Sequence, residues 1–308
     1  MTMTGPQVVT ISASVNGAPV EMPEGATVLD ACRQAGVDVP TLCYGPTMTP
    51  ANACRVCVVE LEGSRALVPS CSRKLEDGME INTDTDRAQH SRRLVMELLG
   101  SASELDRSGE ELQTWMEQAG AQPDRFGAPA PESPRSPPTP GHHSPPEVGV
   151  AASVHEPVKI EDELYVRDYS RCILCYRCVD ACGVEHQNTF AIAVAGRGFD
   201  SRISTEFDFG LPDSACVYCG NCIAVCPTGA LVGKVEYDMR ESGAWDESRQ
   251  EVTRTVCSYC GVGCNLDVHT QTNQIVKVSS PHDHDVTLGN LCIKGRFGWS
   301  YVSSGVDD

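Results

Sequence analysis

Two runs of four cysteines in the middle of the chain have the spacing of iron–sulfur cluster ligands. Within each run the cysteines are separated by two, two and three residues, and Pro227 follows the second run. The runs are Cys172-Cys175-Cys178-Cys182 and Cys216-Cys219-Cys222-Cys226. In this pattern the first three thiolates of a run bind one [4Fe–4S] cluster, while the fourth binds the other cluster. We therefore predict one cluster on Cys172, Cys175, Cys178 and Cys226, and a second on Cys216, Cys219, Cys222 and Cys182.

Zinc is the alternative for a cysteine-rich pattern of this kind. Structural zinc sites usually take four ligands arranged as two pairs. Each run here instead offers three closely spaced cysteines and a fourth slightly further along, and the arrangement occurs twice. The pattern therefore favours iron–sulfur clusters over zinc.

Two further sets of four cysteines flank these runs. The first set has gaps of 10, 2 and 13 residues, and its members are Cys43, Cys54, Cys57 and Cys71. It is a longer variant of the plant-type [2Fe–2S] loop, which has a gap of four before its CxxC pair. The last set has gaps of 2, 3 and 27 residues, and its members are Cys257, Cys260, Cys264 and Cys292. Taken alone, this last spacing would also fit a zinc ribbon.

Composition and charge restrict the compartment and the partners. The 308 residues include 17 cysteines, and the first 17 residues lack the basic start and apolar core of a secretory signal. Because the cysteines cluster as CxxC units, we expect metal ligation in a reducing, cytoplasmic setting. No apolar run approaches the length of a membrane span. The formal charge of −18 argues against nucleic-acid binding and is compatible with a partner that has a positive face, or with solubility alone.

The elements expected around the first cysteine set suggest a small ferredoxin domain over residues 6–85. Residues 8–22 alternate as a hairpin that turns at Asn16-Gly17, and residues 27–36 have the pattern of a helix. Short strands are expected at 57–62 and 65–69, after the cysteine loop. Strand, strand, helix, cysteine loop and strands is the element order of a β-grasp ferredoxin.

The sequence around Cys43, Cys54 and Cys57 resembles a known family. The segments are Thr41-Leu42-Cys43-Tyr44 and Cys54-Arg55-Val56-Cys57-Val58-Val59-Glu60. They resemble the N-terminal [2Fe–2S] domain shared by the large iron–sulfur subunit of NADH dehydrogenase and by some formate dehydrogenases. The resemblance implies one [2Fe–2S] cluster on this set. The remaining cysteine, Cys32, is expected to be a buried small hydrophobe on the first helix.

Residues 86–126 are expected to be helical. One apolar face would hold Leu94, Val95, Leu98 and Leu99, and a second helix would continue with Leu105, Leu112, Trp115 and Met116. In the NADH dehydrogenase family this region carries a [4Fe–4S] site held by one histidine and three cysteines. No cysteine lies between Cys71 and Cys172, so we expect that site to be absent and His90 to be a surface residue.

A proline-rich linker and the two-cubane domain should follow. Residues 127–157 contain too many prolines for a helix or a central strand, and His142 and His143 within them are expected to be solvated rather than metal ligands. The domain of the two central runs should span residues 158–238, with strands near 190–194 and 203–209.

The last cysteine set lies in sequence segments that resemble the N-terminal part of the molybdopterin-dependent oxidoreductases. The matching segments run from Thr255 to Leu266 and from Gly289 to Gly298. The resemblance implies a domain over residues 250–306 whose cysteines bind the [4Fe–4S] cluster nearest the molybdopterin. It also implies that Lys294 lies between that cluster and the pterin.

Taken together, the chain is predicted to be α+β, with one [2Fe–2S] and three [4Fe–4S] clusters. It resembles the N-terminal part of the alpha subunit of an NAD-linked formate dehydrogenase. That resemblance implies a bis-molybdopterin guanine dinucleotide cofactor with Mo or W, on a partner chain or in a C-terminal part beyond residue 308. It also implies electron transfer to a flavin- or NAD-reducing iron–sulfur partner. The alternatives are a stand-alone multi-cluster carrier, or the iron–sulfur subunit of a hydrogenase or NADH dehydrogenase.

Overall fold

The computed structural model describes residues 9–126, 128–129, 150–151, 157–197 and 201–303. The chain divides into two compact units. The first comprises Met1–Tyr44, Pro50–Ser101 and Glu110–Ala128, and the second comprises Gly45–Thr49, Ala102–Gly109 and Pro129–Asp308. No helix in the described parts is long and apolar enough to cross a membrane.

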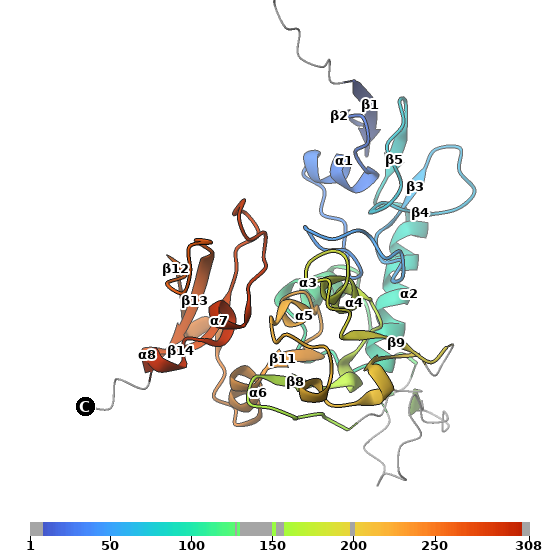
Figure 1. Cartoon of the computed structure of the whole chain (residues 1–308). Coiled ribbons are helices and arrows are strands. Elements are labelled where there is room, and N and C mark those ends of the chain that lie inside the picture. The colour runs from blue at the N-terminus through green and yellow to red at the C-terminus, as the bar shows by residue number, and fades with distance from the viewer. Residues whose placement is uncertain (1–8, 127, 130–149, 152–156, 198–200, 304–308) are drawn as a thin grey trace, which may run out of the picture. The chain divides into compact units, whose positions relative to one another are not determined.

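The first unit is built on a five-stranded sheet with the order β2-β1-β5-β3-β4 (Figure 1). Its strands are β1 (Thr10–Val15), β2 (Ala18–Pro23), β3 (Val58–Leu61), β4 (Val68–Pro69) and β5 (Glu80–Asn82). β1 and β2 form an antiparallel hairpin and β5 pairs parallel to β1, whereas β3 pairs antiparallel to β5 and β4. The hairpin is therefore confirmed. The expected strand at 65–69 is shorter than predicted. The β-grasp subtype remains an interpretation of this element order.

Helix α1 (Val28–Gln34) packs on this sheet. Thr27 and Asp30 form a reciprocal capping box, and Gly36 follows the helix with a positive φ. The buried side chains of the helix join the sheet core, and Cys32 among them is fully buried. Burial raises the pKa of the Cys32 thiol to about 11, so it stays neutral as a small apolar group.

The helices after the sheet differ from the prediction. α2 (Asp86–Ala102) and α3 (Glu110–Gln118) are separate, and Leu105 lies in the loop between them rather than in a helix. α2 buries Met96 and the charged Arg92 and Glu97, whereas Leu98 is 49% exposed. Hydrogen bonds explain why charged side chains are buried on this face of α2. The Arg92 guanidinium donates to the Val58 carbonyl at 2.8 Å, and Glu97 accepts from Arg125 at 2.6 Å. His90 is exposed on α2, as expected.

Two short strands, β6 (Ala128–Pro129) and β7 (Val150–Ala151), lie near the ends of the proline-rich segment. Most of the predicted linker, including His142 and His143, lies outside the described residues.

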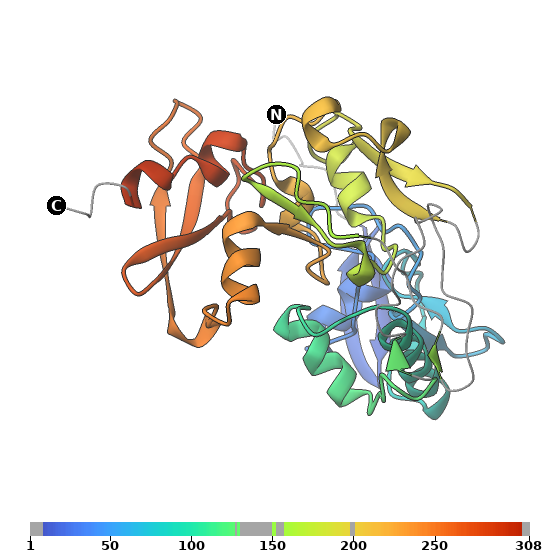
Figure 2. The same ribbon diagram turned by 90° about the horizontal axis from the view of Figure 1, so that it is seen from below.

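The two central cysteine runs lie among short strands and helices (Figure 2). β8 (Tyr165–Arg167) pairs with β11 (Leu231–Gly233), and β9 (Ile192–Ala195) pairs with β10 (Arg202–Thr205). The helical elements are η1 (Tyr169–Arg171), α4 (Arg177–Cys182), η3 (Glu206–Asp208), η4 (Leu211–Asp213), α5 (Asn221–Ala224) and α6 (Lys234–Glu241). The strand expected at 203–209 ends at Thr205, because Phe207 and Asp208 take positive φ values of 51° and 61°.

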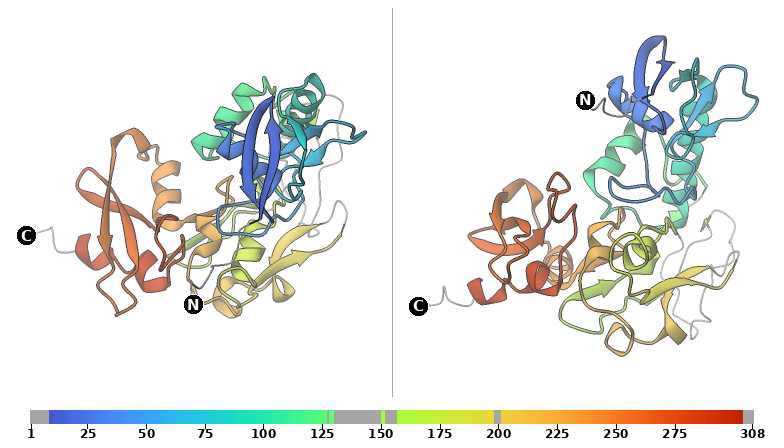
Figure 3. Two further views of the ribbon diagram at one scale, coloured as in Figure 1. Left: turned by 90° about the horizontal axis from the view of Figure 1, so that it is seen from above. Right: turned by 45° about the horizontal axis from the view of Figure 1, so that its top comes forward.

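The last part of the second unit is a three-stranded antiparallel sheet followed by two short helices (Figure 3). Its elements are η5 (Glu247–Arg249), β12 (Gln250–Val256), β13 (Asn265–Gln271), β14 (Gln274–Ser279), α7 (Ile293–Phe297) and α8 (Ser300–Ser303). The last cysteine set lies outside the strands of this sheet: three members lie in the loop between β12 and β13, and Cys292 lies directly before α7.

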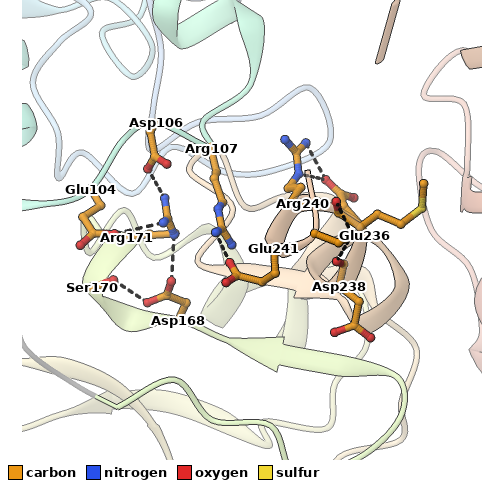
Figure 4. Close-up of polar contacts among 12 residues, drawn as sticks. Glu104, Asp106, Arg107, Asp168, Ser170, Arg171, Glu236, Asp238, Arg240 and Glu241 are labelled. Carbon is orange, nitrogen blue, oxygen red and sulfur yellow. Dashed lines mark hydrogen bonds and ion pairs between the residues drawn. The ribbon is translucent and has the colours of Figure 1, made fainter. Parts of the chain in front are cut away.

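The loop Ala102–Gly109 is attached to the second unit by ion pairs around Arg171 (Figure 4). The Arg171 guanidinium contacts Glu104 at 3.0 Å and Asp168 at 2.8 Å, and it also pairs with Asp106. Arg107 in the same loop pairs with Glu241 of α6. These pairs hold the loop beside Cys172, the first cysteine of the central runs.

Candidate iron–sulfur sites

The structure brings together the first predicted [4Fe–4S] set. All four cysteines, Cys172, Cys175, Cys178 and Cys226, line one small cavity. Tyr169, Ile203 and Leu231 supply apolar walls to the same cavity. Four soft thiol donors around a small cavity with mostly apolar walls suit an iron–sulfur cluster. Cys226 comes from the other run, so the crossed arrangement predicted from the spacing is present as a grouping of side chains.

The second predicted set is grouped in the same crossed way. Burial raises the pKa of Cys222 well above its ordinary value, and the neighbouring Cys219, Cys216 and Cys182 raise it further. Cys182 therefore lies with the second run, although it belongs to the first. The corresponding shift in the pKa of Cys178 arises from burial and then from Cys175, Cys172, Cys226 and Cys222. The third cysteine of each run thus lies near the partners that the spacing assigns to it, and Cys222 of the second group also lies near Cys178.

The two runs repeat one local backbone geometry. The second residue after the first cysteine of each run is left-handed, with φ 52° at Leu174 and 56° at Tyr218. The fourth residue repeats this, with φ 66° at Tyr176 and 72° at Gly220. These turns aim the amides of Leu174 and Tyr218 at the sulfurs of their own first cysteines, each at 3.4 Å. Such N–H groups stabilise thiolates and tune a bound cluster.

The N-terminal set forms two adjacent thiol pairs in the first unit. The Sγ atoms of Cys57 and Cys71 are 3.3 Å apart. Hydrogen bonding within each pair lowers the pKa of Cys57 and Cys43 to about 6, and it raises the pKa of Cys71 and Cys54. Cys43, Cys54 and Cys57 also raise the pKa of Cys71, which places all four predicted ligands in one neighbourhood.

The last set is grouped at the surface of the second unit. Burial raises the pKa of the Cys264 thiol, as do Cys257, Cys292 and Cys260. Cys257 is buried, whereas Cys260 and Cys292 are exposed. Lys294 is also exposed, on the first turn of α7. Among the described residues, no three His, Cys, Asp or Glu side chains converge closely enough to hold a single metal ion. A cluster is wider than one ion and takes one thiolate at each ligated iron.

Arg296 was not predicted from the sequence as a site residue. It is 5% exposed, and its Nε donates to the Cys219 carbonyl at 2.9 Å while Nη2 donates to Asn221 Oδ1 at 3.3 Å. Asn221 Oδ1 also accepts from the Leu291 amide at 3.1 Å. The only feature of the sequence that could have indicated Arg296 is its position in the Gly289–Gly298 segment, which also carries Lys294. Spacing within one segment cannot reveal a contact made 77 residues away.

Three family models match consecutive parts of the chain. A 2Fe-2S iron-sulfur cluster binding domain matches residues 9–86, and a 4Fe-4S dicluster domain matches residues 171–230. The molybdopterin oxidoreductase Fe4S4 domain matches residues 250–304. The chain carries iron–sulfur domains of the molybdopterin oxidoreductase family. These matches make the chain an iron–sulfur protein whose last cluster domain is of the molybdopterin oxidoreductase type.

Several curated proteins are similar along most of the chain. A subunit of an NADH-quinone oxidoreductase of Rhizobium meliloti is 32% identical, over 96% of this chain and 32% of its own length. NADP-reducing hydrogenase subunit HndD of Solidesulfovibrio fructosivorans is 36% identical, over 72% of this chain and 36% of its own. A Staphylococcus aureus protein, provisionally described as a formate dehydrogenase, is 24% identical over 94% of this chain and 31% of its own. The chain thus spans about a third of the length of these relatives.

One solved structure shares the fold. A chain from the crystal structure of an NAD+-reducing [NiFe]-hydrogenase in the H2-reduced state matches with a TM-score of 0.55 and 23% identity. The match covers 73% of this chain and 88% of the hydrogenase chain.

Proposed function

We propose that this chain relays electrons within a molybdopterin-dependent formate dehydrogenase. One end of the relay would be the Mo or W pterin centre, and the other a flavin-containing partner that reduces NAD. Bound clusters supply one-electron redox chemistry at potentials that the surrounding protein sets. The chain's own residues hold successive centres, exclude water from them and position the two ends for their partners.

The crossed grouping of the two central runs carries the relay proposal. Cys182 and Cys226 each join the cysteines of the other run, so the two centres share the segments that hold them. Arg296 then connects the second of these groups to the helix that follows Cys292. Three of the four groups are therefore linked through short, packed elements of one unit, as stepwise electron transfer requires.

The last domain favours a pterin enzyme over the alternatives. Residues 250–304 match the Fe4S4 domain of molybdopterin oxidoreductases, and Lys294 is exposed beside Cys292 where a further domain could reach it. The formate assignment rests on the resemblance of the sequence segments and on the Staphylococcus aureus relative. The hydrogenase-subunit alternative is supported by the 36% identical relative, which covers 72% of this chain.

The test uses the intact complex, isolated anaerobically through a tag on this chain. Formate is expected to reduce the [2Fe–2S] cluster, and the EPR signal of the reduced cluster should appear in rapid-freeze samples. In a Cys264→Ser variant the appearance of that signal with formate should slow more than tenfold, while NADH should still reduce the cluster through the other end. Cys32→Ala, which changes the cysteine outside the four sets, should behave as the unmodified complex.

Several outcomes would contradict the proposal. If hydrogen but not formate reduced the [2Fe–2S] cluster, the hydrogenase alternative would replace the formate dehydrogenase proposal. If the purified complex contained neither molybdenum nor tungsten, the chain would be a carrier without a pterin partner. An unchanged rate in Cys264→Ser would show that electrons from formate do not pass through the last site.

A further inference from the structure

Arg296 is a buried cation whose hydrogen-bond acceptors are neutral. Its bonds go to the Cys219 carbonyl and to the Asn221 amide oxygen, and both partners belong to the second central run or its helix α5. Burial lowers the pKa of the Arg296 guanidinium; Tyr165, Cys219 and Cys222 act in the opposite direction, and no carboxylate among the described residues does so. Burying a charge without a counter-charge is strongly unfavourable.

The backbone of the second run is shaped to accept this side chain. Gly220 takes a φ of +72°, and a Cβ atom there would lie 2.1 Å from Arg296 Cδ. No side chain larger than hydrogen fits between the two. Phe297, the next residue, packs against Tyr165 with the rings tilted by 50° and their centroids 5.4 Å apart. The contact between α7 and the second run is therefore a specific, packed interface rather than a loose approach.

The counter-charge that the site lacks is the one that ligated thiolates provide. A [4Fe–4S] centre with four thiolates carries a net negative charge of about two in its oxidised form. We propose that Arg296 is the internal counter-ion of the cluster held by Cys182, Cys216, Cys219 and Cys222, and that it raises the reduction potential of that cluster selectively. This inference rests on the proposed relay function.

The sign of the effect follows from charge balance. One-electron reduction of this centre adds one unit of negative charge and, in this proposal, no proton. A fixed cation in a poorly solvated site stabilises the reduced form more than the oxidised form, so the potential rises. Arg296 also lies one helical turn after Cys292. The same residue that joins the two neighbouring sites thus favours transfer of an electron onto the second.

The test is an EPR-monitored redox titration of the full chain, prepared anaerobically and reduced with dithionite. Arg296→Gln removes the charge and keeps a hydrogen-bonding side chain, whereas Arg296→Lys keeps the charge. Arg249→Gln is the matched control, because Arg249 is exposed and the change in net charge is identical. The relevant signal is identified by its loss in Cys182→Ser.

We expect Arg296→Gln to lower that one potential by a tenfold change in the reduction equilibrium, about 59 mV for one electron, with the other three unchanged. Arg296→Lys should stay close to the unmodified chain. If Arg296→Gln instead loses the iron of this site, retention of the iron in Arg296→Lys supports the counter-ion role.

Loss of iron from both variants, or an unchanged potential in Arg296→Gln at full iron content, overturns the inference. An equal shift in Arg249→Gln overturns it as well, because the effect would then be one of overall charge. Absence of cluster signals from the unmodified chain would instead count against the relay function itself.

Discussion

Cys182 and Cys226 are the residues that tie the two central sites together. Each follows the third cysteine of its own run by one helical turn or a short bend, yet its thiol lies with the other run. The spacing of two, two and three residues predicted that the fourth cysteine of each run belongs to the other group. That prediction needs only the short sequence of each run. Arg296 and the Gly220 that it packs against could not be predicted in that way, since their contact depends on how two distant segments pack.

Replacing either crossing cysteine should remove one cubane. Cys226→Ser is expected to lose about four iron atoms per chain and to leave the cluster of the second run in place. Cys182→Ser should do the converse. Metal analysis with EPR of the reduced protein measures both. Cys32→Ala, equally a lost thiol but in the core of the first unit, should keep all of its iron. Iron content that is unchanged in Cys226→Ser would show that Cys226 is not a ligand.

At the scale of elements, the sequence predicted the hairpin, α1 and the presence of helices after the sheet. It misassigned the buried face of α2, because leucine spacing suggested Leu98 while the structure buries Arg92 and Glu97 through bonds to distant partners. It also extended a strand past Thr205, where left-handed residues end it. Such errors arise where tertiary hydrogen bonds or backbone turns override side-chain periodicity.

The attachment of the loop Ala102–Gly109 makes a stability prediction. Arg171→Gln would leave the buried Asp168 without its cation, and removing one partner of a buried pair costs about 3–5 kcal/mol. We expect the low end of that range, because Glu104 and Asp106 are largely exposed. Urea unfolding measures the loss. Arg107→Gln changes a residue of the same loop whose partner Glu241 is 49% exposed, unlike the buried Asp168, so it should cost less than about 1 kcal/mol. Equal losses in the two variants would contradict the argument.

The sheet of β13 and β14 should weaken in mild acid because of His269. Its Nε2 lies 2.8 Å from Ser279 Oγ, and burial and then Lys277 lower its pKa, outweighing Asp267, Glu236 and Glu247. The unfolded state therefore binds the proton more readily than the folded state. The stability that neutral His269 supports is complete above its unfolded pKa of about 6.5 and is lost as the pH falls below that value.

Hydrogen exchange of residues 265–279 between pH 7.5 and 5.5 tests this pH dependence. Protection of those amides is expected to fall with pH in the unmodified chain. His269→Gln keeps a polar side chain near Ser279 but removes the titration, so protection should vary less with pH after correction for intrinsic exchange. The same pH dependence in both proteins would assign the effect to another group.

At the scale of the whole molecule, each cysteine set carries its own spacing signature, so the sequence alone suggests an order of cluster domains. Family models match the same order along the chain. Where the compact units divide was not predictable: Gly45–Thr49 and Ala102–Gly109 belong to the second unit, although their neighbours in sequence belong to the first. Met48 explains part of this, since it is buried with Ala181 and Val225. A single methionine forms no sequence pattern from which such a contact could be predicted.

The central claim is that four iron–sulfur centres are held by sixteen of the seventeen cysteines of this chain. The most direct measurement is the content of iron, sulfide and zinc per anaerobically prepared chain, with spin quantification by EPR after reduction. We expect about fourteen iron atoms and as many sulfides, from one [2Fe–2S] and three [4Fe–4S] centres. A colourless protein with stoichiometric zinc and no signal on reduction would contradict it.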